Sequence, residues 1–126
     1  SARDALRVIR HAASGSSLAF FPEGTFVARP GLLRFHTGAF AAAERSGTPI
    51  VPVVIRGTRR CLAPEQFLAL PGRIDVEVLE AIPVPAGAAD AAALRDAARA
   101  AILAAIDEPD ALAATEHPRG ERDDRA

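Results

Sequence analysis

The sequence predicts an α/β fold with a mixed, largely parallel sheet flanked by helices. Two short apolar runs, residues 18–21 and 50–55, have the composition of buried strands. The small and apolar residues between Phe35 and Ser46 are typical of a short helix that packs closely on a sheet. Two strands joined by a helix form a right-handed parallel unit, so the carboxyl ends of both strands should lie at the same edge.

The first predicted element is an amphipathic helix over residues 1–13. Apolar residues recur at helical spacing, and three arginines share another face, Arg3, Arg7 and Arg10. That basic face is either solvated or a contact for anionic lipid.

The middle of the chain contains the predicted parallel unit. Residues 22–34 hold too many Pro and Gly residues for a regular element and are predicted to be a loop of fixed shape. The helix that follows should end at Gly47. Pro52 interrupts the run 50–55 and lacks a backbone donor, so this strand should be at an edge or irregular at that point.

The last part of the chain is predicted to hold one more strand and one long helix. Residues 61–72 are a connection with one helical turn around 65–70, and residues 73–79 alternate polar and apolar as a strand near the edge does. The helix spans residues 88–106, with Asp90 as its cap and a buried stripe of Leu94, Ala98, Ile102 and Ile106. Residues 1–109 are thus one domain, and residues 110–126 are predicted to be a charged, disordered tail.

The composition narrows the possible functions. The chain has 126 residues and a formal net charge of -1, which gives no general attraction to nucleic acid. Cys61 is the single cysteine, which excludes an internal disulfide, argues against a metal site built on cysteine and suits a reducing compartment. No apolar run approaches the ~20 residues that span a bilayer. A cytoplasmic location is therefore expected.

The candidate site lies where the two predicted strands end, because ligands bind at the carboxyl ends of strands in α/β sheets. The loop after the first strand carries Glu23, Gly24, Thr25, Arg29 and Arg34, and the loop after the second carries Arg56, Arg59 and Arg60. Simpler interpretations remain open, since Glu23 and Thr25 can cap a tight turn and the arginines can be solvated.

Three ordered blocks resemble the phospholipid/glycerol acyltransferases, the 1-acylglycerol-3-phosphate acyltransferase group. They are Phe21-Pro22-Glu23-Gly24-Thr25, then Phe35-His36-Thr37-Gly38-Ala39-Phe40, then Val51-Pro52-Val53-Val54-Ile55. Their order and separation match that family from about residue 1 to residue 85. The resemblance implies transfer of a fatty acyl group from acyl-CoA or acyl-carrier protein to lysophosphatidate or a related glycerolipid hydroxyl, with no further cofactor.

The catalytic pair of the family, a His followed five residues later by Asp, is not present. His11, His36 and His117 are followed at that distance by Ser16, Ala41 and Arg122. The resemblance therefore implies an N-terminally truncated domain that lacks the catalytic block and would be inactive alone. The full protein is expected to be peripheral at the inner face of the membrane.

The blocks that remain are those that the family uses to hold the phosphate-bearing acceptor. The resemblance assigns substrate binding to Glu23, Gly24 and Thr25, while Phe26 stands where the family normally has Arg. A guanidinium would then come from Arg29, Arg34 or Arg56. Two alternatives stay open: a non-catalytic lipid- or phosphate-binding remnant of such an enzyme, and a small α/β protein that acts as a partner in an assembly.

Overall fold

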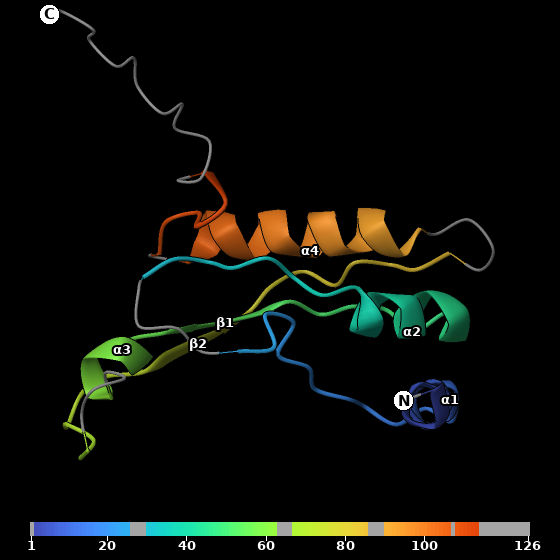
Figure 1. The fold of residues 1–126 in the computed structure, drawn as a ribbon, viewed down its shortest axis with the longest axis horizontal. Helices are drawn as coiled ribbons and strands as arrows, with labels where there is room; N and C mark the ends of the chain where they lie inside the picture. The colour runs from blue at the N-terminus through green and yellow to red at the C-terminus, as the bar shows by residue number, and fades with distance from the viewer. Residues whose placement is uncertain (1, 26–29, 63–66, 86–89, 107, 114–126) are drawn as a thin grey trace, which may run out of the picture.

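The computed structural model describes residues 2–25, 30–62, 67–85, 90–106 and 108–113. These residues form helices and strands in the order α1 (Ala2–Ala13), α2 (Gly38–Ser46), β1 (Val53–Arg56), α3 (Thr58–Cys61), β2 (Asp75–Val78) and α4 (Ala91–Ala105), as Figure 1 shows. A small sheet is flanked by helices, which confirms the predicted α/β class.

The three longer helices form where the sequence predicts them. Helix α2 begins at Gly38, later than predicted, because the Phe35 side chain is buried and the His36 amide bonds the carbonyl of Pro22 instead. It ends at Gly47, as predicted. Helix α4 is capped by the Asp90 carboxylate, which accepts a hydrogen bond from the Ala92 amide at 3.1 Å.

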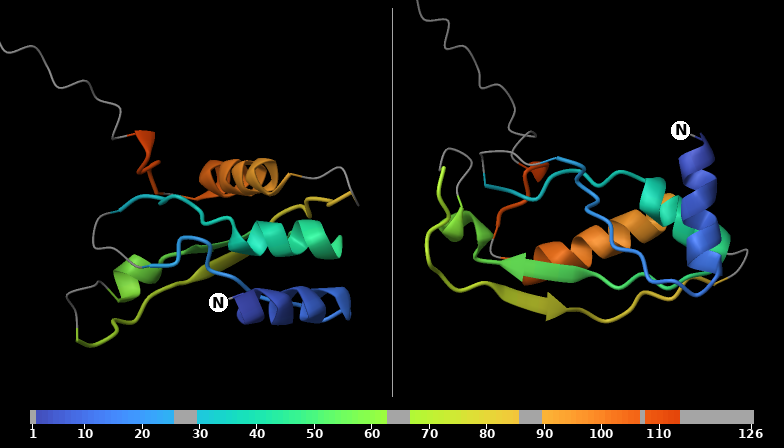
Figure 2. Two further views of the ribbon diagram at one scale, coloured as in Figure 1. Left: turned by 45° about the vertical axis from the view of Figure 1, so that its right-hand side comes forward. Right: turned by 90° about the horizontal axis from the view of Figure 1, so that it is seen from below.

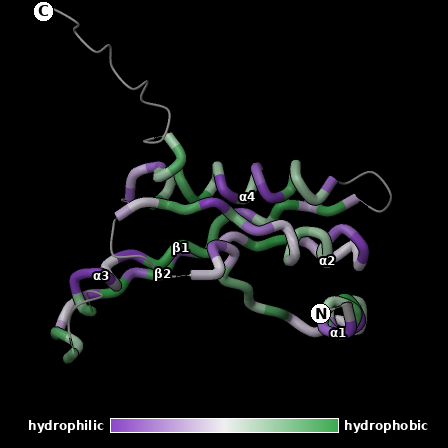
Figure 3. Tube along the Cα trace, in the orientation of Figure 1, coloured by the Kyte–Doolittle hydropathy of each residue, from purple (hydrophilic) through white to green (hydrophobic). Residues whose placement is uncertain are grey.

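The predicted stripe of α4 faces the core. Leu94 and Ala98 are buried, while Ile102 and Ile106 are half-buried. Figure 3 shows apolar and polar residues alternating along this helix. The predicted start of the helix, residues 88 and 89, lies outside the described residues.

The sheet consists of β1 and β2, which pair antiparallel with Val53 opposite Val78 and Arg56 opposite Asp75. Ile50 and Ile82 form a further antiparallel bridge. The register shifts by one residue between that bridge and β1, and Pro52 lies at the shift. The predicted irregularity at Pro52 is therefore confirmed.

The prediction of a largely parallel sheet is wrong for the described residues, where the ladder is antiparallel and parallel pairing is limited to the bridge between Leu32 and Asp110. Residues 18–21 form no strand. An apolar run becomes a strand only when a neighbouring segment accepts and donates its backbone hydrogen bonds, and no described segment pairs with this one.

The stretch 56–60, predicted as a loop, contains most of α3. Gly57 has a positive φ of 94°, and the chain then closes one helical turn in which the Leu62 amide donates to the Thr58 carbonyl. The helical turn predicted around 65–70 is absent from residues 67–70, while residues 65 and 66 lie outside the described part.

The core lies between α2, α4 and the loop that precedes α2. Its buried members are Leu32, Phe35, Phe40, Ala43, Val84, Leu94 and Ala98. Helix α4 covers one face of the sheet, where Val54 is buried, and α1 packs against α2 (Figures 1 and 2). The other face of the sheet exposes Val53, Ile55, Val76 and Val78.

The segment after α4 folds back onto the loop at Leu32. The Ala111 amide donates to the Leu32 carbonyl at 3.2 Å, and the Leu32 amide donates to the Pro109 carbonyl at 2.8 Å. Of the predicted tail 110–126, residues from 114 onward lie outside the described residues, so the predicted disorder stays a prediction.

Candidate functional site

The first predicted site residues lie on one tight turn, Pro22–Thr25. The Gly24 amide donates to the Phe21 carbonyl at 3.0 Å, which closes the turn. Gly24 has a φ of +68°, and a Cβ at this position would lie 3.0 Å from the His36 ring. The positive φ favours glycine here, and a side chain would also require the exposed His36 ring to move by a few tenths of an ångström.

Two hydrogen bonds fix this turn to the loop before α2. The Glu23 Oε2 atom accepts from the Leu33 amide at 2.9 Å, and the Pro22 carbonyl accepts from the His36 amide at 2.8 Å. The structure thus joins the first two blocks noted in the sequence. One oxygen of Glu23 thus holds a backbone amide of the facing loop, and this contact is not the capping of its own tight turn.

Thr25 and Arg34 are exposed, and neither has a hydrogen-bond partner among the described residues. Thr25 is the last residue of the turn, and Arg34 follows Leu33, the residue that Glu23 binds. The amide and hydroxyl of Thr25 and the guanidinium of Arg34 are thus accessible to a ligand. Arg29 and Phe26 lie outside the described residues.

Arg56 lies at the end of β1 and has structural contacts. Its Nη1 donates to the Ala105 carbonyl at 2.8 Å, and its Nη2 pairs with Glu77 Oε2 at 2.8 Å. The guanidinium therefore connects β1 with the end of α4 and with β2.

Glu108 bridges the loop 22–34 and the stretch 56–60. Its Oε2 accepts from the Gly31 amide at 2.7 Å, and its carboxylate pairs with Arg59. Burial raises the pKa of Glu108, but the hydrogen bonds from Arg59 and Gly31 and the charge of Arg59 outweigh it, so the pKa lies below its ordinary value of 4.5. The sequence pattern gave no signal for Glu108.

Arg99 of α4 holds the same loop from the other side. Its guanidinium donates to the carbonyls of Leu32 at 2.6 Å and Leu33 at 3.0 Å, and to Asp110 Oδ1 at 2.7 Å. The hydrogen bond from Arg99 and backbone hydrogen bonds lower the pKa of Asp110. Arg99 was not predicted, because a single Arg on a helix has the pattern of a solvated residue.

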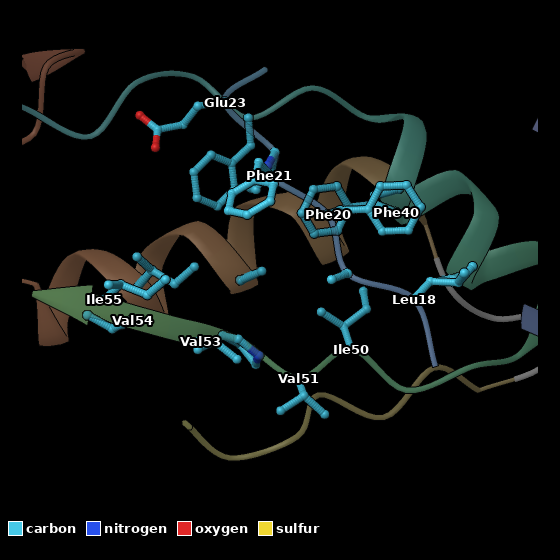
Figure 4. A pocket seen from close by; sticks show the side chains of 18 of the residues that line it. Leu18, Phe20, Phe21, Glu23, Phe40, Ile50, Val51, Val53, Val54 and Ile55 are labelled. Carbon is cyan, nitrogen blue, oxygen red and sulfur yellow. The ribbon is translucent and has the colours of Figure 1, made fainter. Parts of the chain in front are cut away.

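A large apolar groove runs beside the turn, with a volume of about 1070 Å³. Residues 15–23 line one side, and residues 48–55 line the other (Figure 4). Its floor comes from the core and α4, through Leu32, Phe35, Phe40, Ala98 and Ile102, and Glu23, Thr25, Thr58, Arg59 and Glu108 also line it. The three sequence blocks thus surround one groove.

The described residues contain no group of three His, Cys, Asp or Glu side chains that could hold a metal ion. None of the described helices is long and apolar enough to cross a bilayer.

Comparisons with a family model and with curated proteins both match acyltransferases. The family model described as Acyltransferase matches residues 2–56. A 1-acyl-sn-glycerol-3-phosphate acyltransferase of Chlamydomonas reinhardtii is 35% identical over 95 residues, which is 75% of this chain and 28% of that protein. A putative enzyme of the same name from Caenorhabditis elegans is 37% identical over 90 residues, 70% of this chain and 32% of that protein.

The fold has a solved counterpart. The crystal structure of PlsC, the 1-acyl-sn-glycerophosphate (LPA) acyltransferase from Thermotoga maritima, matches with a TM-score of 0.74 and 24% identity over 83% of this chain and 45% of that one. The chain spans only about a third of the length of the two curated relatives above. The match of residues 2–56 and these relatives support the phospholipid acyltransferase family as the family that this chain resembles.

Proposed function

We propose that this chain is the acceptor-holding part of an acyltransferase of phospholipid biosynthesis. The complete enzyme moves a fatty acyl group from acyl-CoA or acyl-carrier protein to the hydroxyl of lysophosphatidate or a related glycerolipid. The hydroxyl oxygen bonds the thioester carbonyl carbon, the carbon–sulfur bond breaks, and the thiol leaves with the hydroxyl proton. The observation that carries the proposal is the Pro22–Thr25 turn, fixed by Leu33 and His36 beside an apolar groove.

The turn supplies groups suited to a phosphate-bearing acceptor. The amide and hydroxyl of Thr25 have no partner among the described residues and can donate to phosphate oxygens. Gly24 has no side chain, which allows close approach of the ligand to the backbone. Arg34 is exposed and directly follows Leu33, the residue that Glu23 holds. We assign to its guanidinium the ion pair with the phosphate of the acceptor.

Glu23 and Arg56 have supporting roles in this proposal. The Glu23 carboxylate cannot approach a phosphate favourably, so it positions the loop through Leu33 and leaves its other oxygen for a glycerol hydroxyl. Arg56 holds the end of β1 through Glu77 and Ala105 and reaches the acceptor only if these contacts break. Arg29 is a further candidate for the phosphate.

Titration of the isotope-labelled chain with a short-chain lysophosphatidate tests acceptor binding. We expect the amide resonances of Glu23, Gly24 and Thr25 to shift, and Arg34→Gln to weaken binding several-fold. Arg73→Gln is the matched control, because Arg73 is exposed and, within the part of the chain that the structure describes, pairs only with Asp75 at 2.8 Å. Absence of shifts at the turn, or equal weakening by both substitutions, would contradict the proposal.

The chain alone should not catalyse acyl transfer, because none of its histidines has the Asp partner that the family uses. Incubation with acyl-CoA and lysophosphatidate should release no CoA thiol above a blank that accounts for Cys61. Turnover that Glu23→Ala abolishes would show that this chain carries its own catalytic base.

We further propose that the complete protein lies at the inner face of the membrane as a peripheral protein. Helix α1 supports this, because Arg3, Arg7 and Arg10 are exposed and Leu6 beside them is 53% exposed. The chain should sediment with vesicles that contain anionic phospholipid and not with neutral ones. Replacing the three arginines by Gln should abolish this sedimentation, and its persistence would exclude α1 as the contact.

A further inference from the structure

One wall of the apolar groove is a backbone segment that has no hydrogen-bond partner among the described residues. Residues 17–20 lie outside every helix and strand, and their amides and carbonyls make no hydrogen bond with any described residue. The side chains of Leu18 and Phe20 are 42% and 46% exposed along the same stretch. An exposed row of unpaired backbone groups is a template for pairing with another strand.

The opposite wall is the free edge of β1. The Pro52 carbonyl accepts from the Leu79 amide at 2.9 Å, so Pro52 faces the β2 side of the ladder. Backbone direction alternates along a strand, so Val54 also faces β2, whereas Val53 and Ile55 turn their amides and carbonyls away from it. These groups make no backbone hydrogen bond outside the β1–β2 pair within the described part of the chain.

The groove between these walls is apolar on its floor. Phe35, Phe40 and Ile102 line it, and Figure 4 shows Leu18, Phe20 and Phe21 across from Val51, Val53 and Ile55. An acyl chain would cover both walls and remove their backbone groups from water without replacing the lost hydrogen bonds, which is unfavourable. A polypeptide strand has a donor and an acceptor at each edge and replaces them.

We propose that the groove binds an extended apolar polypeptide strand, which pairs with residues 17–20 along one edge and with Val53 and Ile55 along the other. About six residues fill it, the length of an ordinary strand. The strand would complete a sheet whose two outer segments are already in place. More than two thirds of each of the two curated relatives lies outside the match, so their remaining sequence is a source of natural candidates.

The inference does not depend on the proposed function, since its test measures no acyl transfer. The probe is an eight-residue peptide, Lys-Thr-Val-Ile-Val-Ile-Thr-Lys, added to the isotope-labelled full chain. We expect amide hydrogen exchange to slow at least tenfold at Leu18, Ala19 or Phe20 on one wall and at Val53 or Ile55 on the other.

Two N-methylated versions of the peptide are the matched controls. One carries methyl groups on alternate central amides and the other on the remaining central amides, so each blocks one edge while the apolar surface is preserved. Each version should bind at least tenfold more weakly than the parent peptide. Weakening by one version alone would mean pairing at a single edge, and weakening by neither would mean purely apolar binding; both results overturn the proposal.

Two further occupants are tested in the same way. Myristate should leave the exchange of these amides unchanged, and protection by myristate without protection by the peptide would overturn the proposal in favour of an acyl chain. Protection that rises with chain concentration in the absence of peptide would show that a second copy fills the groove, and it would overturn the proposal too.

Discussion

Glu23 illustrates how one side chain can position a loop through a single backbone contact. Its Oε2 accepts the Leu33 amide, and that bond fixes the Pro22–Thr25 turn against the loop before α2. A carboxylate is well suited to this contact because a charge-assisted hydrogen bond to a backbone amide is stronger than a neutral one. The position of Thr25 and its accessible amide depend on this bond.

Glu23→Ala should therefore destabilise the chain by about 1–3 kcal/mol, because the Leu33 amide loses its acceptor. Glu23→Gln keeps a carbonyl acceptor of the same shape and should destabilise the chain less than Glu23→Ala does. Glu80→Ala is the control, because Glu80 is exposed and has no hydrogen-bond partner among the described residues, and it should change stability by no more than about 0.5 kcal/mol. Urea unfolding measures all three, and equal effects of Glu23→Ala and Glu80→Ala would contradict the role given to Glu23.

Glu23→Gln also separates positioning from ligand binding. If Glu23 acts only through Leu33, Glu23→Gln should weaken lysophosphatidate binding only slightly, in line with its small loss of stability. A large loss of affinity with stability preserved would instead show that the charge of Glu23 contacts the acceptor.

At the scale of the elements, α4 holds the site loop as well as the core. Arg99 binds two successive carbonyls of the loop and the carboxylate of Asp110, and its side chain is only 13% exposed. A planar guanidinium can serve these three acceptors at once, whereas an ammonium group cannot match the same geometry.

Arg99→Ala should lower the free energy of unfolding by about 2–3 kcal/mol, because the loop carbonyls lose a charged donor. Arg99→Lys should recover only part of this. Arg95→Ala on the same helix is the matched control, since Arg95 pairs with the exposed Asp96 on the surface, and it should cost no more than about 0.5 kcal/mol. Chemical denaturation measures the free energy of unfolding of each variant. Equal losses for Arg99→Ala and Arg95→Ala would show that Arg99 does not hold the loop.

The elements also explain which features could be predicted from the sequence. The helices 2–13, 38–46 and 91–105 carry their own signals, such as Asp90 at the start of α4 and Gly47 after α2. The irregularity at Pro52 follows from its lack of a backbone N–H donor. These features depend on neighbours that are close in the sequence.

Features that depend on distant partners could not be predicted. Residues 18–21 have the composition of a strand, but no described segment pairs with them, so the expected parallel ladder is not formed. The contacts of Arg59 with Glu108 and of Arg99 with Leu32 join residues far apart in the chain. In the sequence alone, Arg99 has the pattern of a solvated charge, and Arg59 is a candidate either for ligand contact or for a solvated charge.

At the scale of the whole molecule, two carboxylates attach the segment after α4 to the rest of the chain. Glu108 binds Arg59 beside β1 and the Gly31 amide, while Asp110 binds Arg99. The pKa of each carboxyl lies below its ordinary value of 4.5 or 3.8 in the folded chain. A carboxyl with a lowered folded pKa stabilises the fold above its unfolded pKa and loses that contribution as the pH falls through the folded pKa.

The free energy of unfolding should therefore stay constant from about pH 7 to about pH 5. It should fall as the pH drops below 4.5, the ordinary pKa of a glutamate such as Glu108. Glu108→Gln should be less stable than the parent chain at pH 7, because Arg59 loses its charged partner, and the two should converge as the pH falls through the lowered pKa of Glu108. Glu80→Gln is the control and should run parallel to the parent throughout. Urea unfolding at each pH measures the difference in the free energy of unfolding. A difference between Glu108→Gln and the parent that stays constant down to the lowest pH at which both chains fold would mean that the charge of Glu108 does not attach the segment after α4.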